Sequence, residues 1–115
     1  MTNSATIPAG VGWTALMTAY ARAQETRRAD RLFEDPYAVN YIAALTSGTV
    51  PGRDTLPRVG PARDDGSSAL WSLLTAYFAG RTPFFDNQVR AGVAAGAVQV
   101  CILAAGLDSR AQRDR

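Results

Sequence analysis

Apolar residues in the first part of the chain recur at three- and four-residue intervals, the spacing of one face of a helix. The spacing predicts a helix that runs from an N-cap at Thr14 to about Arg28. Its apolar face is formed by Leu16, Met17, Tyr20 and Ala23. Arg22 lies close to this face rather than opposite it, which is unusual for a charge that only meets solvent.

A second helix is predicted over Pro36–Leu45. Asp35 is a good N-cap, and Pro36 suits the first helical position, where its missing N–H costs nothing. Residues 47–66 follow with four Gly, three Pro and six charged residues, and no apolar periodicity continues through them. We therefore expect this stretch to be a linker or mobile loop.

Helical spacing returns from Ser67, with an apolar stripe made by Leu70, Trp71, Leu74, Tyr77 and Phe78. The segment Gly80–Pro83 is predicted to interrupt this helix, because a proline inside a helix removes a backbone donor. Asp86 is then predicted to cap a further helix over Asn87–Ala95, with Gly96 following its C-terminus.

Val98–Leu103 is a short, continuously apolar segment, the pattern of a strand buried on both faces of a parallel sheet. Cys101 lies inside it and is predicted to be a buried structural thiol rather than a nucleophile. A lone strand leaves backbone N–H and C=O groups unpaired on both edges. The chain has no second convincing strand, so we expect an α/β domain that is interrupted at residue 115.

Composition narrows the possible functions. The chain has 115 residues, of which 47% are hydrophobic, with no run long enough for a membrane helix and no secretory signal at its start, so a cytoplasmic protein is expected. All 12 basic residues are Arg, scattered among 10 acids rather than clustered, which argues against nucleic-acid binding. One Cys and no His leave no Ser-His or Cys-His pair and no usual zinc ligands, so no metal is expected and no catalytic residue is identified.

The stretch VQVCILAAGLDSRA carries the strongest chemical signal. It is an apolar segment that runs into a small-residue turn at Ala104, Ala105 and Gly106. Open α/β sheets bind cofactors at the carboxyl ends of strands, and small residues there leave room for the ligand. The stretch lacks the G-x-G-x-x-G pattern of dinucleotide sites. On these residues alone, a tight turn without a ligand is an equal alternative.

Four segments, taken in order, resemble the bacterial branch of the leucine carboxyl methyltransferase-like family. ILAAGLDSRA resembles its first S-adenosylmethionine (AdoMet) binding motif, and RTPFFD at residues 81–86 resembles its R-T-x-F-F-D element. FEDPYA at residues 33–38 resembles its L-F-x-D-P-Y-A element, and GWTA at residues 12–15 resembles a common start of its N-terminal helix.

The resemblance implies an α/β fold: an N-terminal helical cap plus the first strand of a Rossmann-like methyltransferase sheet, truncated. Residues 1–66 would be the cap, with its loop at 47–66, and residues 67–115 the start of the AdoMet-binding domain. The second strand, with its ribose-binding acid, is absent. The chain alone is therefore expected to be inactive and prone to self-association.

The resemblance also assigns site residues. Arg81 matches the arginine that pairs with the AdoMet carboxylate, a task that suits the guanidinium fork. Arg22 is either a second basic residue near that carboxylate or a surface charge. Ala104, Ala105 and Gly106 would form the turn beneath the cofactor. Asp108 either caps the following helix, which we favour, or hydrogen-bonds near the ligand.

The implied function is AdoMet-dependent transfer of a methyl group to an oxygen, carboxylate or hydroxyl, of a small-molecule acceptor. One alternative is non-enzymatic: an inactive remnant or a helical interaction module. The other is a fragment of an NAD(P)-dependent oxidoreductase, which the missing G-x-G-x-x-G pattern disfavours.

Overall fold

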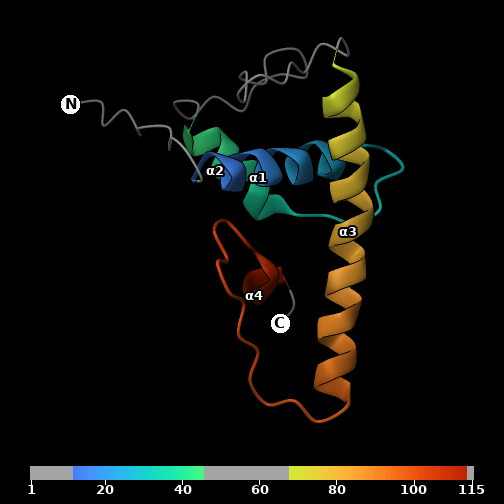
Figure 1. The fold of residues 1–115 in the computed structure, drawn as a ribbon, viewed down its shortest axis with the longest axis vertical. Coiled ribbons are helices and arrows are strands. Elements are labelled where there is room, and N and C mark those ends of the chain that lie inside the picture. The colour runs from blue at the N-terminus through green and yellow to red at the C-terminus, as the bar shows by residue number, and fades with distance from the viewer. Residues whose placement is uncertain (1–11, 46–67, 114–115) are drawn as a thin grey trace, which may run out of the picture.

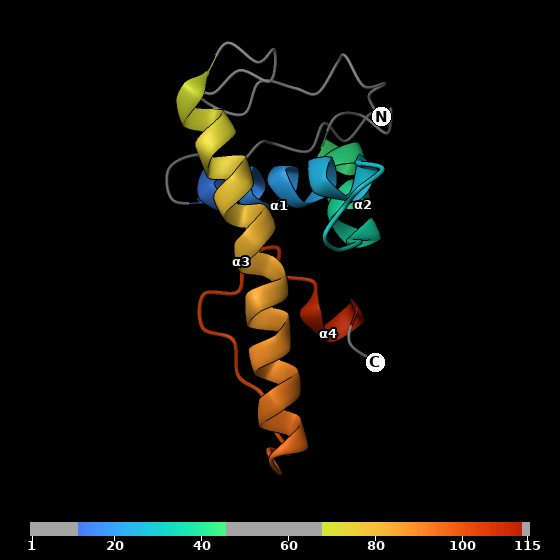
Figure 2. The same ribbon diagram turned by 90° about the vertical axis from the view of Figure 1, so that its right-hand side faces the viewer.

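A computed structural model describes residues 12–45 and 68–113 (Figure 1). These residues form four helices: α1 (Gly12–Arg27), α2 (Pro36–Leu45), α3 (Ala69–Ala94) and α4 (Arg110–Arg113). α1 contacts both α2 and α3, and the long α3 crosses beside the α1–α2 pair (Figures 1 and 2). The predicted linker at residues 47–66 lies outside the described residues.

The predicted apolar face of α1 is the centre of the core. Leu16, Tyr20 and Ala23 are buried, as the spacing indicates, although the helix begins at Gly12 and so includes Thr14 rather than starting from it as a cap. α2 and α3 complete the core with Ala38, Ile42, Trp71 and Phe78. The rings of Tyr20 and Trp71 lie 5.5 Å apart between centroids, which joins α1 to α3.

α2 forms over the predicted residues, Pro36–Leu45. The Oδ1 atom of Asp35 accepts a hydrogen bond from the backbone N–H of Ala38 at 3.0 Å, so the predicted N-cap is confirmed. The cap pins the first turn of α2 against α1, where Ala38 is fully buried.

α3 is one continuous helix, so the predicted break at Gly80–Pro83 is wrong. The helix starts at Ser68, whose side chain accepts from the N–H of Trp71 at 3.0 Å, and Pro83 lies inside it. A proline in this position costs about 3 kcal/mol. The buried residues of α3 lie on both sides of Pro83, from Trp71 to Asp86, and their tertiary contacts stabilise the continuous helix despite that cost.

Because α3 is continuous, the prediction that Asp86 caps a further helix is wrong. Asp86 is not an N-cap but an interior residue of α3 that is only 2% exposed. The predicted C-terminus is nearly correct, since α3 ends at Ala94 and Gly96 adopts a left-handed conformation with φ of +110°.

The segment after α3 returns toward α1 and α2 without forming a strand (Figures 1 and 2). Among the described residues no strand is present, and Val98 and Leu103 are 102% and 87% exposed. Cys101 is also exposed, so its prediction as a buried thiol is wrong. A strand needs a neighbouring strand to pair its backbone N–H and C=O groups. Within the described part of the chain, no such strand is present beside residues 98–103.

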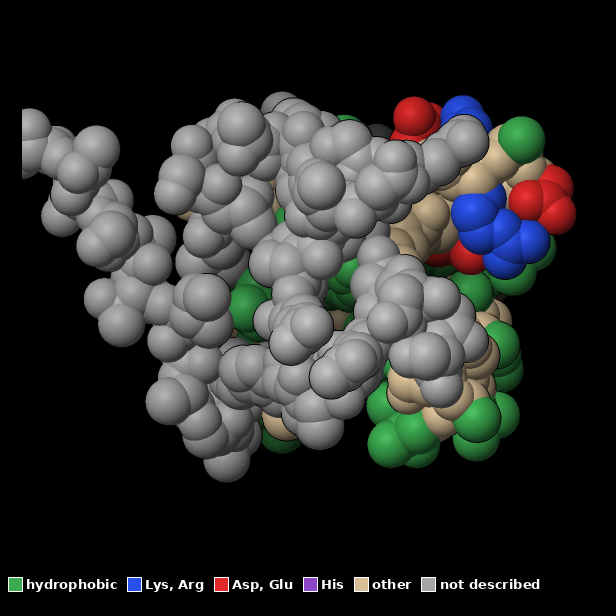
Figure 3. All heavy atoms as spheres, turned by 90° about the horizontal axis from the view of Figure 1, so that it is seen from above, with side chains coloured by type: hydrophobic (Ala, Val, Ile, Leu, Met, Phe, Trp, Pro, Cys, Tyr) green, Lys and Arg blue, Asp and Glu red, His purple; other side chains and the backbone are tan. Residues whose placement is uncertain are grey.

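Charged side chains are exposed at the turn between α1 and α2, and large apolar side chains are exposed on α3. Seen from above (Figure 3), charged side chains of the turn between α1 and α2 gather at one edge, where Arg28 pairs with Glu25 and Asp30. Apolar side chains lie on α3 beside them, with Leu70 and Leu73 62% and 68% exposed. No helix in residues 12–45 or 68–113 has the length and apolar character needed to cross a membrane.

Candidate functional site

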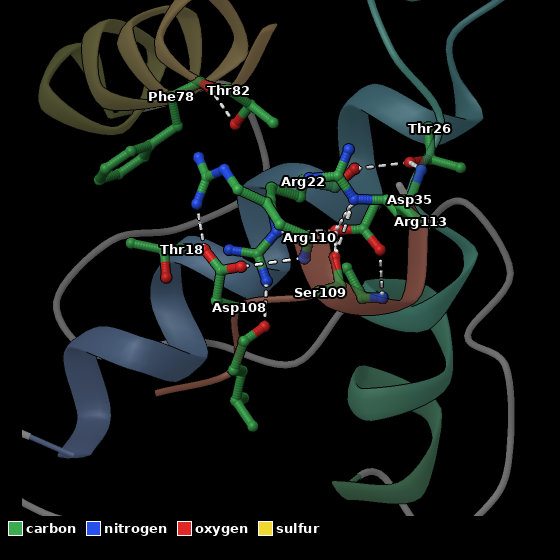
Figure 4. Close-up of polar contacts among 12 residues, drawn as sticks. Thr18, Arg22, Thr26, Asp35, Phe78, Thr82, Asp108, Ser109, Arg110 and Arg113 are labelled. Atoms are coloured by element: carbon green, nitrogen blue, oxygen red, sulfur yellow. Dashed lines mark hydrogen bonds and ion pairs between the residues drawn. The ribbon is translucent and has the colours of Figure 1, made fainter. Parts of the chain in front are cut away.

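The candidate site is a polar cluster where α1, α3, the start of α2 and the segment around α4 meet (Figure 4). Its centre is Asp35, which is fully buried. The Oδ2 atom of Asp35 accepts from Nε of Arg22 at 2.9 Å and from the hydroxyl of Ser109 at 2.7 Å. One carboxylate therefore joins α1 to Ser109, which lies 74 positions after Asp35 in the chain.

The environment of Asp35 keeps it ionised. Burial raises the pKa of Asp35, but the hydrogen bonds donated by Ser109, the Ala38 backbone and Arg22 outweigh it, and the net pKa lies below its ordinary value. A buried carboxylate with three donors is a fixed negative charge, and it holds the groups that donate to it.

Arg22 is a partly buried charge with two protein partners. Its Nε donates to Asp35, and its Nη2 donates to the carbonyl oxygen of Leu107 at 2.6 Å. Its side chain is only 12% exposed, so the alternative of a surface charge is wrong. The guanidinium thus reaches the backbone of the LDSRA motif, which lies next to α1 only in the folded chain.

A second carboxylate, Asp86, holds the short helix α4 against α3. It pairs with Nε of Arg110 at 3.0 Å and with both terminal nitrogens of Arg113, at 2.8 and 3.1 Å. Nε of Arg113 also donates to the Ser109 hydroxyl at 2.9 Å. These residues were absent from the predicted site. They are far apart in the sequence, and no local pattern pairs an aspartate of one helix with arginines of another.

Asp108 lies just before α4, which begins at Arg110. Its Oδ1 accepts from the backbone N–H of Arg110 at 2.9 Å, as the interpretation of a helix start expects, and its other oxygen pairs with the side chain of Arg110. Asp108 also lines a small polar hollow together with Arg22 and Arg81. The structure therefore brings together three of the six predicted site residues.

Arg81 faces this hollow from α3. Its guanidinium carbon lies 5.3 Å from the centroid of the Phe78 ring, with Tyr77 and Phe85 at 5.9 and 5.8 Å. These rings hold the charge by cation–π attraction. Within residues 12–45 and 68–113, no carboxylate pairs with Arg81, unlike Arg22, Arg110 and Arg113.

Counted over the described residues, the charges of the cluster do not balance. Four guanidinium groups, from Arg22, Arg81, Arg110 and Arg113, meet the three carboxylates of Asp35, Asp86 and Asp108. The single excess positive charge belongs to Arg81, which lines the hollow. An anionic group in the hollow would compensate it, and a carboxylate fits the guanidinium fork.

Among the small residues of the turn, Gly106 lies against α1. Ala104, Ala105 and Gly106 are exposed and do not line the hollow. Gly106 has φ of +55°, and a Cβ added there would lie 3.0 Å from the Cβ of Ala15 in α1. The close approach that requires glycine at this position is therefore to α1.

Among the described residues, no group of three or more His, Cys, Asp or Glu side chains is arranged to hold a metal ion. The three aspartates instead neutralise arginines or cap helices. The arginines of the cluster give it the chemistry to attract an anion, and their bonds to the LDSRA motif suit a role in orienting the turn.

Comparison with known proteins shows which protein family the chain belongs to. Residues 15–115 match the family model of leucine carboxyl methyltransferase. A protein of Parafrankia sp. assigned as an S-adenosyl-L-methionine-dependent methyltransferase is 48% identical over 105 residues, which are 91% of this chain and 32% of the relative. Similarly assigned proteins of Saccharopolyspora erythraea and Mycobacteroides abscessus are 44% and 43% identical, each over 93% of this chain and 34% and 35% of the relative. No solved structure matches the chain.

The chain belongs to the leucine carboxyl methyltransferase family, as its four motif segments indicated. It spans about a third of the length of these relatives.

Proposed function

We propose that the chain is the AdoMet-binding N-terminal part of an AdoMet-dependent methyltransferase that methylates an oxygen, carboxylate or hydroxyl, of a small molecule. AdoMet as cofactor rests on family membership and on the assignment of the relatives. The observation that carries the proposal within the chain is Arg81, an arginine without a carboxylate partner among the described residues, at a hollow shared with the LDSRA motif.

Arg81 would hold the carboxylate of AdoMet. The guanidinium offers two parallel donors to a carboxylate, and the surrounding rings of Tyr77, Phe78 and Phe85 restrict its motion. Arg22 adds positive potential at the same hollow, although two of its nitrogens already donate to protein oxygens. Asp108 would orient the start of α4 beside the ligand.

The turn at Ala104, Ala105 and Gly106 would lie beneath the cofactor, with its shape set by α1. In this proposal residues 1–66 are the helical cap, and residues 67–115 begin a Rossmann-like domain in which residues 98–103 would pair with further strands. The exposed apolar side chains of Val98 and Leu103 are consistent with a face that such strands would cover.

The proposed methyl transfer requires only binding and orientation from the residues of this chain. AdoMet, held through its carboxylate by Arg81, would supply a methyl group on a sulfonium for transfer to an acceptor oxygen, with a neutral thioether as the leaving group. An acceptor carboxylate is already deprotonated at neutral pH and needs no general base, which agrees with a cluster that holds charge rather than moving protons. The role of these residues is to bind and orient.

The proposal is tested by titrating the ¹⁵N-labelled 115-residue chain with AdoMet and with 5′-methylthioadenosine, which lacks the amino-acid moiety. Binding no tighter than millimolar is expected, within reach of NMR, with AdoMet preferred. Arg81→Gln should abolish this preference, whereas Arg90→Gln, a change at an exposed position of the same helix, should keep it. Equal binding of the two ligands by the unmodified chain would refute the role of Arg81.

A second candidate is a helical interaction module, favoured by the exposed Leu70, Leu73 and Tyr77 of α3. It predicts no response to AdoMet at any concentration. Titration with NAD serves as the control for an oxidoreductase. A response to NAD but not to AdoMet would support that alternative.

A further inference from the structure

Asp35 connects α1, α2 and the LDSRA motif through hydrogen bonds of its side chain. It lies in the FEDPYA segment before α2, it is fully buried, and it contacts Arg22 of α1 and Ser109 of the LDSRA motif. We propose that Asp35 is a positioning residue for cofactor binding: through Arg22 and Ser109, it fixes the backbone at Leu107–Ser109 beside Arg81. The inference rests on the proposed function, which it deepens.

Arg22 transmits the position of Asp35 to the turn. A guanidinium is planar and rigid, so when its Nε donates to Asp35, the direction of Nη2 is also set. That nitrogen donates to the carbonyl oxygen of Leu107 at 2.6 Å. Removing the carboxylate would free Arg22 to rotate, and would leave a positive charge that is only 12% exposed without its counterion.

Ser109 is the second connection. Its hydroxyl donates to Oδ2 of Asp35 and accepts from Nε of Arg113, so the orientation of the hydroxyl is set from both sides. Leu107 and Ser109 flank Asp108, whose side chain lines the hollow. Asp35 therefore holds the backbone on both sides of a residue that faces the proposed ligand.

The two oxygens of Asp35 have separate tasks. Oδ1 accepts from Ala38 and caps α2, whereas Oδ2 accepts from both Arg22 and Ser109. Asp35→Asn separates these tasks. Its remaining carbonyl oxygen can still cap α2, but the NH₂ group that replaces Oδ2 can only donate, and so cannot accept from Arg22 or Ser109.

The experiment compares Asp35→Asn with Glu25→Gln in the 115-residue chain. Glu25 is a matched control, because it is a buried carboxylate of α1 that accepts from the N–H of Leu32 at 2.9 Å, in the turn at the other end of α1 from Gly106. The readouts are the amide resonances of residues 107–110 and the affinity for AdoMet relative to 5′-methylthioadenosine. Helix content by circular dichroism monitors folding.

Asp35→Asn should shift the resonances of residues 107–110 and weaken AdoMet binding about threefold or more, and Glu25→Gln should do neither. Unmoved resonances, or an AdoMet loss equal to that of Glu25→Gln, would overturn the inference. If Asp35→Asn does not fold, Arg22→Lys and Ser109→Ala decide, since each removes one connection and should produce the same shifts. If the unmodified chain does not prefer AdoMet, the proposed function fails, and the resonances alone still decide whether Asp35 holds the turn.

Discussion

Arg22 and Leu107 are 85 residues apart in the chain and are joined by a 2.6 Å hydrogen bond from the guanidinium to the backbone carbonyl. Arg22 also donates to Asp35, so α1, the start of α2 and the LDSRA motif meet at one side chain. The helices before the motif therefore do more than cover it. They contact its backbone directly, through the bond from Arg22 to the carbonyl oxygen of Leu107.

The stability of the chain should fall in acid more steeply than that of Asp35→Asn. Because the folded pKa of Asp35 lies below its ordinary value, its ionised form contributes stability that is fully present above the unfolded pKa of about 4. That contribution is lost as pH falls through the lower, folded pKa. The carboxylate is faced by Arg22, at 2.9 Å, and by Arg113, at 3.8 Å.

Urea unfolding from pH 6 to pH 2.5 measures this difference. The free energy of unfolding of the unmodified chain should decline with a steeper slope below pH 4 than that of Asp35→Asn. Parallel slopes would mean that the carboxylate does not hold Arg22 and Ser109 in solution.

Gly106→Ala should destabilise the chain by about 1–2 kcal/mol from the left-handed backbone alone. The added Cβ would also lie 3.0 Å from the Cβ of Ala15, so α1 must shift as well. Gly92→Ala is the matched control, because Gly92 lies inside α3 with no atom within 4 Å of its added Cβ. That control should stabilise the chain by about 0.5–1 kcal/mol. Thermal unfolding of both variants checks the opposite signs.

Ala104→Gly should stabilise the chain by about 1 kcal/mol. Ala104 has φ of +49°, a left-handed conformation that costs a residue with a Cβ about 1–2 kcal/mol. Glycine relieves this strain but loses more backbone entropy on folding, which reduces the net gain. A lower midpoint of urea unfolding in Ala104→Gly than in the unmodified chain would contradict the strain at this position.

The 115-residue chain should self-associate. Apolar side chains are exposed on α3, with Leu73 68% exposed, and on the segment that follows it, with Leu103 87% exposed. Gel filtration with light scattering over a tenfold dilution should give a mass that falls with concentration. Leu73→Gln together with Leu103→Gln should shift the equilibrium toward monomer, while Leu32→Gln, a change at an exposed leucine of the charged turn, should not. A constant monomer mass would refute this expectation.

The helices α1 and α2 could be predicted from the sequence because their signals are local. The apolar spacing of α1 identifies its buried face. Asp35 immediately precedes α2 and caps it by accepting from the backbone N–H of Ala38, three residues further on. Gly96 likewise ends α3 through its own backbone freedom. The family could also be identified from the sequence, because its four motif segments are short runs of residues that occur in the same order in this chain.

The continuity of α3, the exposure of residues 98–103 and the polar cluster depended on contacts between distant residues. Pro83 is a local signal for a break, but the buried residues on both sides of it keep the helix intact. Val98–Leu103 has the composition of a strand, yet a strand forms only against a partner. Asp35 looks like a local cap in the sequence, and its hydrogen bond with Ser109 exists only because folding brings the two residues together across 74 positions. Local propensity acts within a few residues, whereas charge pairing and burial act between whatever residues the fold makes neighbours.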